Sequence, residues 1–298
     1  MTLYVAVSGG KGGTGKSFVA TNVAVRLAER GFRVLLVDMD VEAPNDHILL
    51  GVDVEKGEKR SITIFYPLID YSRCTPCGAC AAVCDTGAIV YARGRPPFVM
   101  PRLCSGCRAC LHACPYGAIR EGARVIGEVR EARHPKLPNL YLVSGVLREG
   151  EEHTPPAVVE VRRRTLALAE GYDVVVADTG AGTGTSVTVA LQPARLLVAV
   201  TEPTPLGLHD LRAILEVARG MGLRTWLVIN KHGIGPEEGH VRLAEEYGVE
   251  RVFRVPFTRT AAEAYARGVP VHWLDPRDPA ARALGEVAEA LSEVVRRG

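Results

Sequence analysis

The feature that most constrains the fold of this chain is a pair of cysteine runs near its middle. They read Cys74-x2-Cys77-x2-Cys80-x3-Cys84 and Cys104-x2-Cys107-x2-Cys110-x3-Cys114, and they contain all eight cysteines of the 298-residue sequence. A small disulfide-bonded scaffold distributes its cysteines through the whole chain. The concentration of thiols in one segment instead predicts thiolates that hold metal in a reducing compartment.

The spacing within the two runs is typical of iron–sulfur sites. A Cys-x2-Cys-x2-Cys run places three thiolates around one cluster, and in two-cluster ferredoxins the fourth cysteine ligates the other cluster. Residues 72–122 resemble these ferredoxins and repeat internally, since Gly-Ala-Ile follows both runs. The resemblance implies two 4Fe–4S clusters, one held by Cys74, Cys77, Cys80 and Cys114 and the other by Cys104, Cys107, Cys110 and Cys84. A zinc site is the alternative. Asp85 stands where ferredoxins usually have proline, which leaves the backbone direction there open.

A second motif, Gly10-Lys11-Gly12-Gly13-Thr14-Gly15-Lys16-Ser17, matches a phosphate-binding loop. It follows a predicted strand and opens a predicted helix, which is the context that such a loop requires. The backbone N–H groups of residues 12–15 can close around phosphate oxygens, and the helix N-terminus adds its dipole. We expect Lys16 to reach the terminal phosphates and the Ser17 hydroxyl to ligate Mg²⁺.

Apolar strands alternate with amphipathic helices along most of the chain. The predicted strands are Leu3–Ser8, Val34–Asp38, Leu140–Val143, Val174–Asp178, Leu196–Thr201, Thr225–Asn230 and Arg251–Val255. The predicted helices lie near Lys16–Glu29, Pro156–Glu170, Leu206–Met221, Glu237–Tyr247, Ala261–Arg267 and Pro279–Arg296. Short strands rich in Val, Leu and Ile, separated by helices, indicate an α/β fold with a doubly wound, mostly parallel sheet covered on both faces. Its ligands are expected at the carboxyl ends of the strands.

The alternation stops between Val52 and Arg133 and then resumes, so the cysteine segment is predicted to be an insertion. Glycines and prolines, including Gly94-Arg95-Pro96-Pro97, interrupt this stretch. We therefore expect a P-loop ATPase domain in two parts, residues 1–66 and 123–298. A small α+β ferredoxin-like module at 67–122 separates them. An inserted module is held at both ends, which a flexible tail is not.

The additional lysine of the loop, Lys11, makes this segment resemble the deviant P-loop of the MinD/ParA family of ATPases. The order of motifs resembles a subgroup of that family with an inserted ferredoxin domain. In the family this lysine crosses a dimer interface to the partner's nucleotide. The resemblance therefore implies an ATP-hydrolysing homodimer with ATP and Mg²⁺ between its subunits.

The resemblance extends to further residues, which follow strands. Val37-Asp38-Met39-Asp40 resembles the first switch of the family, which implies that Asp40 orients the attacking water and Asp38 lies near Mg²⁺. Asp178-Thr179-Gly180-Ala181-Gly182 resembles the second switch, with Asp178 in the magnesium shell and the Gly182 N–H on the γ-phosphate. Asn230 stands where the family reads adenine, and Pro256 where a loop packs on the base. An acid pair is also a common helix cap and asparagine a common turn residue. The expected catalytic residues are Lys11, Lys16 and Asp40.

No cysteine follows Cys114, so the chain lacks the later cysteines with which related proteins bind a bridging or transferable cluster. We expect the clusters to stay in the protein and to carry electrons. These electrons would pass to or from an unknown redox or metalloenzyme partner, under the control of ATP-driven dimer switching. A metalloenzyme assembly factor and a positioning ATPase of the ParA/MinD kind are the alternatives.

The remaining sequence features favour a cytoplasmic protein. The net charge of +2 does not indicate a nucleic-acid partner. No apolar run is long enough to span a bilayer, and no signal peptide is evident. The last predicted helix lacks the aromatic residues of a membrane-surface helix and is expected to pack on the sheet.

Overall fold

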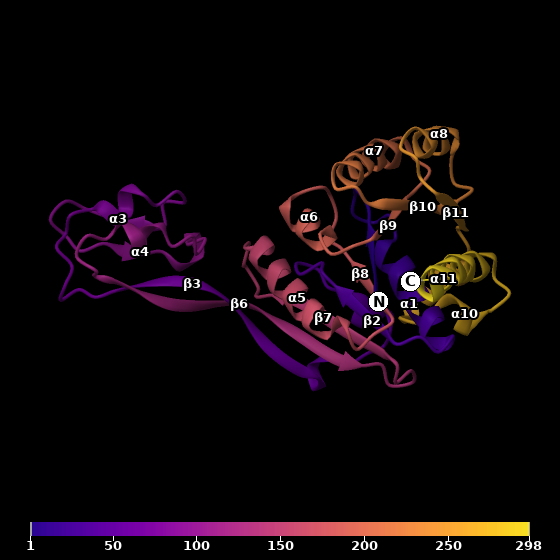
Figure 1. Ribbon diagram of the computed structural model, residues 1–298, viewed down its shortest axis with the longest axis horizontal. Coiled ribbons are helices and arrows are strands. Elements are labelled where there is room, and N and C mark those ends of the chain that lie inside the picture. The colour runs from indigo at the N-terminus through magenta and orange to yellow at the C-terminus, as the bar shows by residue number, and fades with distance from the viewer. Residues whose placement is uncertain (1, 298) are drawn as a thin grey trace.

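A computed structural model describes residues 2–297 as a nine-stranded sheet with helices on both faces and a cysteine-rich module at one edge (Figure 1). The strands of the sheet are β1 (Leu3–Ser8), β2 (Val34–Asp38), β3 (Glu58–Ile69), β6 (Ile119–Arg133), β7 (Leu140–Leu147), β8 (Val174–Asp178), β9 (Leu196–Thr201), β10 (Arg224–His232) and β11 (Arg251–Pro256). Their order is β11-β10-β9-β1-β8-β2-β7-β6-β3. Every pair from β11 to β7 is parallel, and β6 pairs antiparallel with both β7 and β3. The predicted doubly wound, mostly parallel α/β fold is confirmed.

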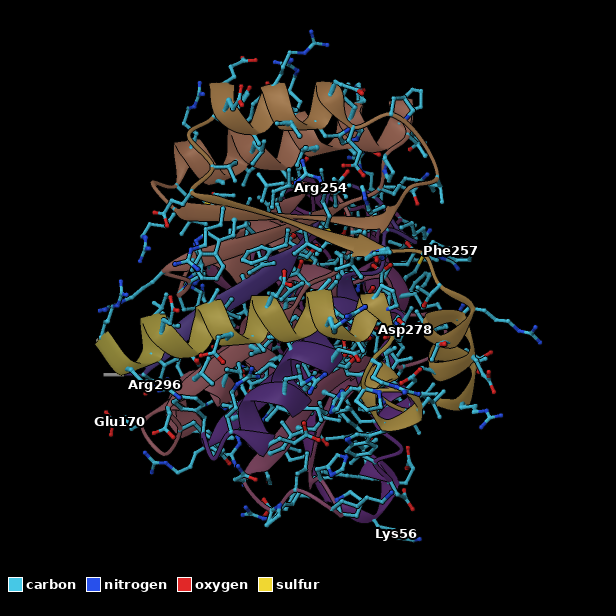
Figure 2. All side chains as sticks on the ribbon, turned by 90° about the vertical axis from the view of Figure 1, so that its right-hand side faces the viewer. Lys56, Glu170, Arg254, Phe257, Asp278 and Arg296 are labelled. Carbon is cyan, nitrogen blue, oxygen red and sulfur yellow. The ribbon has the colours of Figure 1, made fainter. Side chains whose placement is uncertain are left out.

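Two layers of helices cover the sheet because its strands are apolar on both faces. In β1, Val5 and Val7 face one core, and Tyr4 and Ala6 face the other. The first layer contains α1 (Lys16–Glu29), α9 (Arg259–Arg267), α10 (Val271–Leu274) and α11 (Pro279–Arg297). The second contains α5 (Thr154–Ala169), α6 (Thr185–Leu191), α7 (Pro205–Gly220) and α8 (Glu238–Glu246). Figure 2 shows α11 between the labelled residues Asp278 and Arg296, running alongside the strands at this edge of the sheet. None of the helices within residues 2–297 has the length and apolarity that crossing a bilayer requires.

The strands β3 and β6 are absent from the predicted elements, and they form a long ribbon that carries the cysteine segment. β6 pairs with β7 from Gly127 to Arg133, whereas its earlier part, from Ile119 to Val125, pairs with β3 alone. A bulge between Ile62 and Thr63 falls at this junction. Bulges bend a strand and increase its twist, so the ribbon can leave the sheet here. The ribbon crosses both expected domain boundaries, near 66 and 122, and the three-part division remains a prediction.

The end of the ribbon holds a small module with an internal repeat. Its elements are α3 (Ala79–Ala82), β4 (Ile89–Val90), β5 (Phe98–Val99), the 3-10 helix η2 (Pro101–Leu103) and α4 (Ala109–Ala113). The same turn follows both cysteine runs, because the Gly87 N–H donates to the Cys84 carbonyl at 3.1 Å and the Gly117 N–H to the Cys114 carbonyl at 3.3 Å. Asp85 therefore does not redirect the backbone where ferredoxins have proline. Two short helical turns, α2 (Asp46–Leu49) and η1 (Val54–Lys56), connect β2 to the ribbon.

Candidate nucleotide site and cysteine hollows

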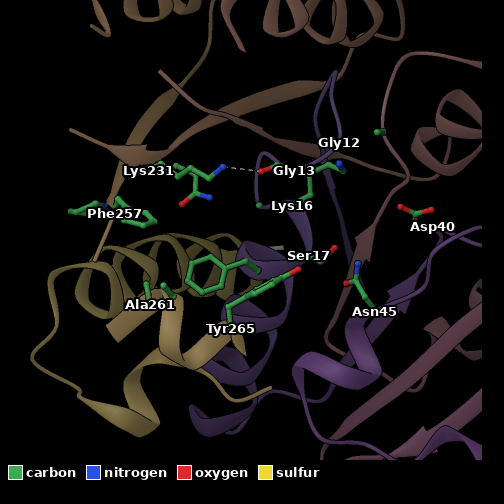
Figure 3. Close-up of a pocket in the computed structure, with 16 residues that line it drawn as sticks. Gly12, Gly13, Lys16, Ser17, Asp40, Asn45, Lys231, Phe257, Ala261 and Tyr265 are labelled. Atoms are coloured by element: carbon green, nitrogen blue, oxygen red, sulfur yellow. Dashed lines mark hydrogen bonds between the residues drawn. The ribbon is translucent and has the colours of Figure 1, made fainter. Parts of the chain in front are cut away.

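The predicted phosphate-binding loop lies between β1 and α1 and borders a cavity of about 430 Å³ (Figure 3). Gly15 precedes α1 with a left-handed φ of 94°, and a Cβ there would lie 2.1 Å from Asn230 Nδ2. Glycine is therefore required at this position by both conformation and space. The buried Lys16 ammonium donates to the Lys11 carbonyl at 3.1 Å, so its side chain folds back over the loop.

Two neighbouring residues of β10 hold the loop in place. Asn230 Nδ2 donates to the Thr14 carbonyl at 2.8 Å. Lys231 Nζ donates to the Gly13 carbonyl at 3.0 Å, the dashed line in Figure 3. Asn230 lines the cavity as expected, but its amide bonds to the loop here, so adenine reading remains a prediction. The role of Lys231 was missed, although it is adjacent to Asn230 in the sequence.

Lys11 is paired within its own chain. Its ammonium lies 3.4 Å from Glu202 Oε1, and the Lys231 ammonium lies 2.8 Å from Oε2 of the same carboxylate. Burial alone would raise the pKa of Glu202, but the two lysines outweigh it and lower that pKa. Glu202, at the end of β9, was not foreseen from the sequence, because no motif marks it.

Three buried carboxylates lie beneath the loop, where β2 and β8 end. Oxygens of Asp38, Asp46 and Asp178 lie within 4.8 Å of one another. Ser17 Oγ donates to Asp178 Oδ2 at 2.5 Å, and the backbone N–H groups of Asn45 and Asp46 donate to Asp38 Oδ2. Burial raises the pKa of Asp178 to about 7, although the Ser17 hydrogen bond lowers it. Burial and neighbouring carboxylates raise the pKa values of Asp38 and Asp46. Asp46 was not predicted.

The two expected switch segments meet beside the cavity. Asp40 lines it, and a Cβ at Gly180 would lie 3.8 Å from Asp40 Oδ1. The Gly182 N–H, expected to contact the γ-phosphate, donates to the Gly9 carbonyl at 3.3 Å. Contact with phosphate therefore requires this N–H to exchange its partner, and its role remains a prediction.

An apolar wall closes the side of the cavity opposite Asp40 (Figure 3). Pro256 lines this wall, and its packing on the base remains a prediction; Phe257 and two unforeseen residues, Phe18 of α1 and Tyr265 of α9, line the wall with it. The rings of Phe18 and Tyr265 meet edge to face with centroids 6.5 Å apart. Phe257 and Tyr265 are both more than half exposed, so a planar ring can cover them.

The eight cysteines fall into two sets, each around its own small hollow. Cys74, Cys77, Cys80 and Cys114 line one hollow, and Cys84, Cys104, Cys107 and Cys110 line the other. These are the sets expected from the ferredoxin pattern. Cys80 and Cys110 are buried, and burial raises the pKa of Cys110 to about 11. Ligation by a metal overcomes such a shift, because a coordinated thiol is deprotonated.

Known proteins share both the sequence and the fold of this chain. Residues 5–271 match the model of the CobQ/CobB/MinD/ParA nucleotide binding domain. An uncharacterised protein of Methanocaldococcus jannaschii is 31% identical over 266 residues, which cover 89% of this chain and 90% of that protein. An iron-sulfur cluster carrier protein of Pyrococcus abyssi is 26% identical, with 96% of this chain and 84% of the carrier covered.

Solved structures agree on the fold. The cell division ATPase MinD of Pyrococcus furiosus superposes with a TM-score of 0.62 at 20% identity, covering 99% of this chain and all of the other. MinD of Pyrococcus horikoshii, solved with Mg-ADP, also gives 0.62, at 21% identity, with 99% and 97% covered. The predicted MinD/ParA-type ATPase is confirmed at the level of family and fold. The chain belongs to the CobQ/CobB/MinD/ParA family of nucleotide-binding domains.

Proposed function

We propose that this protein is an ATP-dependent iron–sulfur protein in which nucleotide-driven dimer switching gates electron transfer through two 4Fe–4S clusters. The observation that carries the proposal is the placement of the two complete cysteine sets. They sit at the end of a ribbon whose strand β6 pairs with β7, and the Leu147 N–H at the end of β7 donates to the carbonyl of Val41, which follows Asp40.

The cavity suits a nucleoside triphosphate. The loop and Lys16 would neutralise the phosphates, and the apolar wall would receive the base. The residues beneath the loop fit Mg²⁺, because Asp178 Oδ1 is buried without a hydrogen-bond partner beside Ser17. Ser17, Asp38 and Asp178 would hold the ion, which neutralises charge on the transferred phosphoryl group. Asp40, at the rim of the cavity, would orient the attacking water.

Dimer formation requires Lys11 to change partners. The Lys11 side chain is 36% exposed, and its ammonium is bound to Glu202. Glu202 is shared between two lysines, so the phosphates of a neighbouring subunit's nucleotide can displace its pair with Lys11. Glu202 keeps Lys231 when Lys11 leaves, which avoids a buried unpaired carboxylate.

The cysteine hollows favour iron–sulfur clusters over zinc. Four thiolates on one zinc ion, with bonds of about 2.3 Å, lie about 3.8 Å from one another. Within residues 2–297 no three cysteine sulfurs lie mutually within 4.8 Å, so the thiolates of each hollow are spread for a larger group. Cys84 and Cys114 cross between the repeats, as in two-cluster ferredoxins. The reducing cytoplasm would keep such thiolates unpaired.

A chain of contacts connects the cavity to the module. Glu42, two residues after Asp40 of the first switch segment, accepts a hydrogen bond from Thr154 at the start of α5. The loop before Thr154 carries Glu151, which forms an ion pair with Arg124 of β6. The guanidinium of Arg102, two residues before Cys104, lies over Gly150 of the same loop, since a Cβ there would be 3.4 Å from it. Movement of the switch can thus reach the second cluster.

The alternative function is delivery or maturation of iron–sulfur clusters in another protein. It is favoured by the carriers that align over 96% of this chain. The two proposals differ in what leaves the protein, which is an electron in one case and a cluster in the other.

The decisive experiment compares ATP hydrolysis under anaerobic conditions with the clusters oxidised and with them reduced. Gated electron transfer is supported if the two hydrolysis rates differ and if Lys16→Ala abolishes hydrolysis in both states. Equal rates together with cluster transfer to an apo-ferredoxin would favour the carrier function. An unchanged rate in Lys16→Ala would refute the nucleotide assignment itself.

A further inference from the structure

The carboxylate of Asp46 is a buried polar group that its surroundings in the described chain do not explain. The residue is fully buried, and neither of its side-chain oxygens has a hydrogen-bond partner. Its backbone N–H is bound to Asp38 Oδ2 at 3.1 Å, which holds the residue against the neighbouring carboxylates. In its ionised form a buried carboxylate without a partner is strongly destabilised, so these oxygens require either a proton or a cation beside them.

Two further buried oxygens, on residues paired with Asp38 in the sheet, are also left without partners. Asp178 Oδ1 is buried and unpaired, and so is the hydroxyl of Ser144. In the sheet Asp38 is paired with Asp178 on one side and with Ser144 on the other. Residues paired in register project from the same face of a sheet, so Ser144 lies on the carboxylate side. The donors form a set composed entirely of oxygen.

We propose that Asp46 joins Asp38 and Asp178 in a site for a hard divalent cation, Mg²⁺ or Mn²⁺, that fills in the absence of nucleotide. Oxygen-only donors with two or more carboxylates are what these cations bind. A water molecule has two protons and no charge, so it cannot satisfy three buried carboxylates. The cation compensates their charge and accounts for the unpaired oxygens.

The inference deepens the proposed function and rests on it only in naming Mg²⁺ as the physiological ion. In nucleotide-dependent sites the ion arrives with the phosphates, whereas this chain would retain it between cycles. The difference comes from Asp46, which adds a third carboxylate to Asp38 and Asp178.

The test is equilibrium dialysis of Mn²⁺ against nucleotide-free protein with its clusters intact, so that the thiolates are occupied. We expect one Mn²⁺ per chain, with affinity lowered about 10- to 100-fold or more by Asp46→Asn. Asp53→Asn is the matched control, because it removes the same charge from an exposed cap that asparagine fills equally well.

Binding to the wild type only when ADP is added would overturn the inference while leaving the nucleotide site standing. Equal affinity in Asp46→Asn and wild type would overturn it as well. Retained Mn²⁺-ADP binding shows that a variant is folded, and Asp46→Ser provides a second variant in case the amide is too crowded. Failure of the wild type to bind ADP would instead refute the proposed function.

Discussion

The replacement of Gly15 by alanine tests the geometry of the phosphate-binding loop most directly. Gly15 has φ 94° and ψ 28°, and an L-residue in the left-handed region costs about 1–2 kcal/mol. The added Cβ would lie 2.1 Å from Asn230 Nδ2, so the amide must move and lose its 2.8 Å bond to Thr14, worth about 1 kcal/mol. We therefore expect Gly15→Ala to destabilise the domain by about 2–3 kcal/mol.

Urea unfolding followed by tryptophan fluorescence measures this loss. Both tryptophans of the sequence, Trp226 and Trp273, lie outside the cysteine module and report on the nucleotide domain. With a slope of about 2–3 kcal/mol per molar urea, the midpoint should fall by about 1 M. Gly12→Ala is the matched control, because nothing lies within 4 Å of its Cβ position and its φ is not in the left-handed range.

A double-mutant cycle separates the two causes. In an Asn230→Ala background the clash is absent, so Gly15→Ala should cost only the backbone strain of about 1–2 kcal/mol. A Gly15→Ala midpoint equal to that of Gly12→Ala would refute the reasoning. An unchanged cost in the Asn230→Ala background would refute the clash alone.

Three further predictions concern the proposed function. Lys16→Ala should lower ATP hydrolysis at least about 100-fold, measured as phosphate release, because it removes charge stabilisation of the transferred phosphoryl group; a smaller loss would argue against its position. Cys84→Ser should lower the iron content and disturb the second cluster, measured by iron analysis and absorption, whereas an unchanged content would contradict the crossed ligand sets. Thr154→Val removes the hydrogen bond to Glu42 and should abolish the rate difference between oxidised and reduced protein while the basal rate remains; a retained difference would exclude this contact as the route.

Much of the nucleotide domain was predictable because the relevant information is local in the chain. The bounds of β1, β2, β8, β9 and α1 match the predicted ones, since apolar runs and their separation are read directly from the sequence. The ribbon was missed because glycines and prolines obscured its alternation, and the bulge at Ile62 breaks the period. α6 was missed because Thr185–Leu191 is rich in β-branched residues; packing against α5 and β1 makes it helical nevertheless.

The sequence by itself determined which chemical groups this protein carries and the order in which they follow strands and helices. Loop spacing and cysteine spacing are covalent properties of the chain, so they predicted the phosphate loop and the two thiolate sets. Only the tertiary structure decided which distant groups meet. Lys11 and Glu202 are 191 residues apart in the chain, and Lys231 reaches Gly13 across 218. Asp46 became a candidate ligand only when folding buried it beside Asp178, because burial and the lack of a partner are properties of packing.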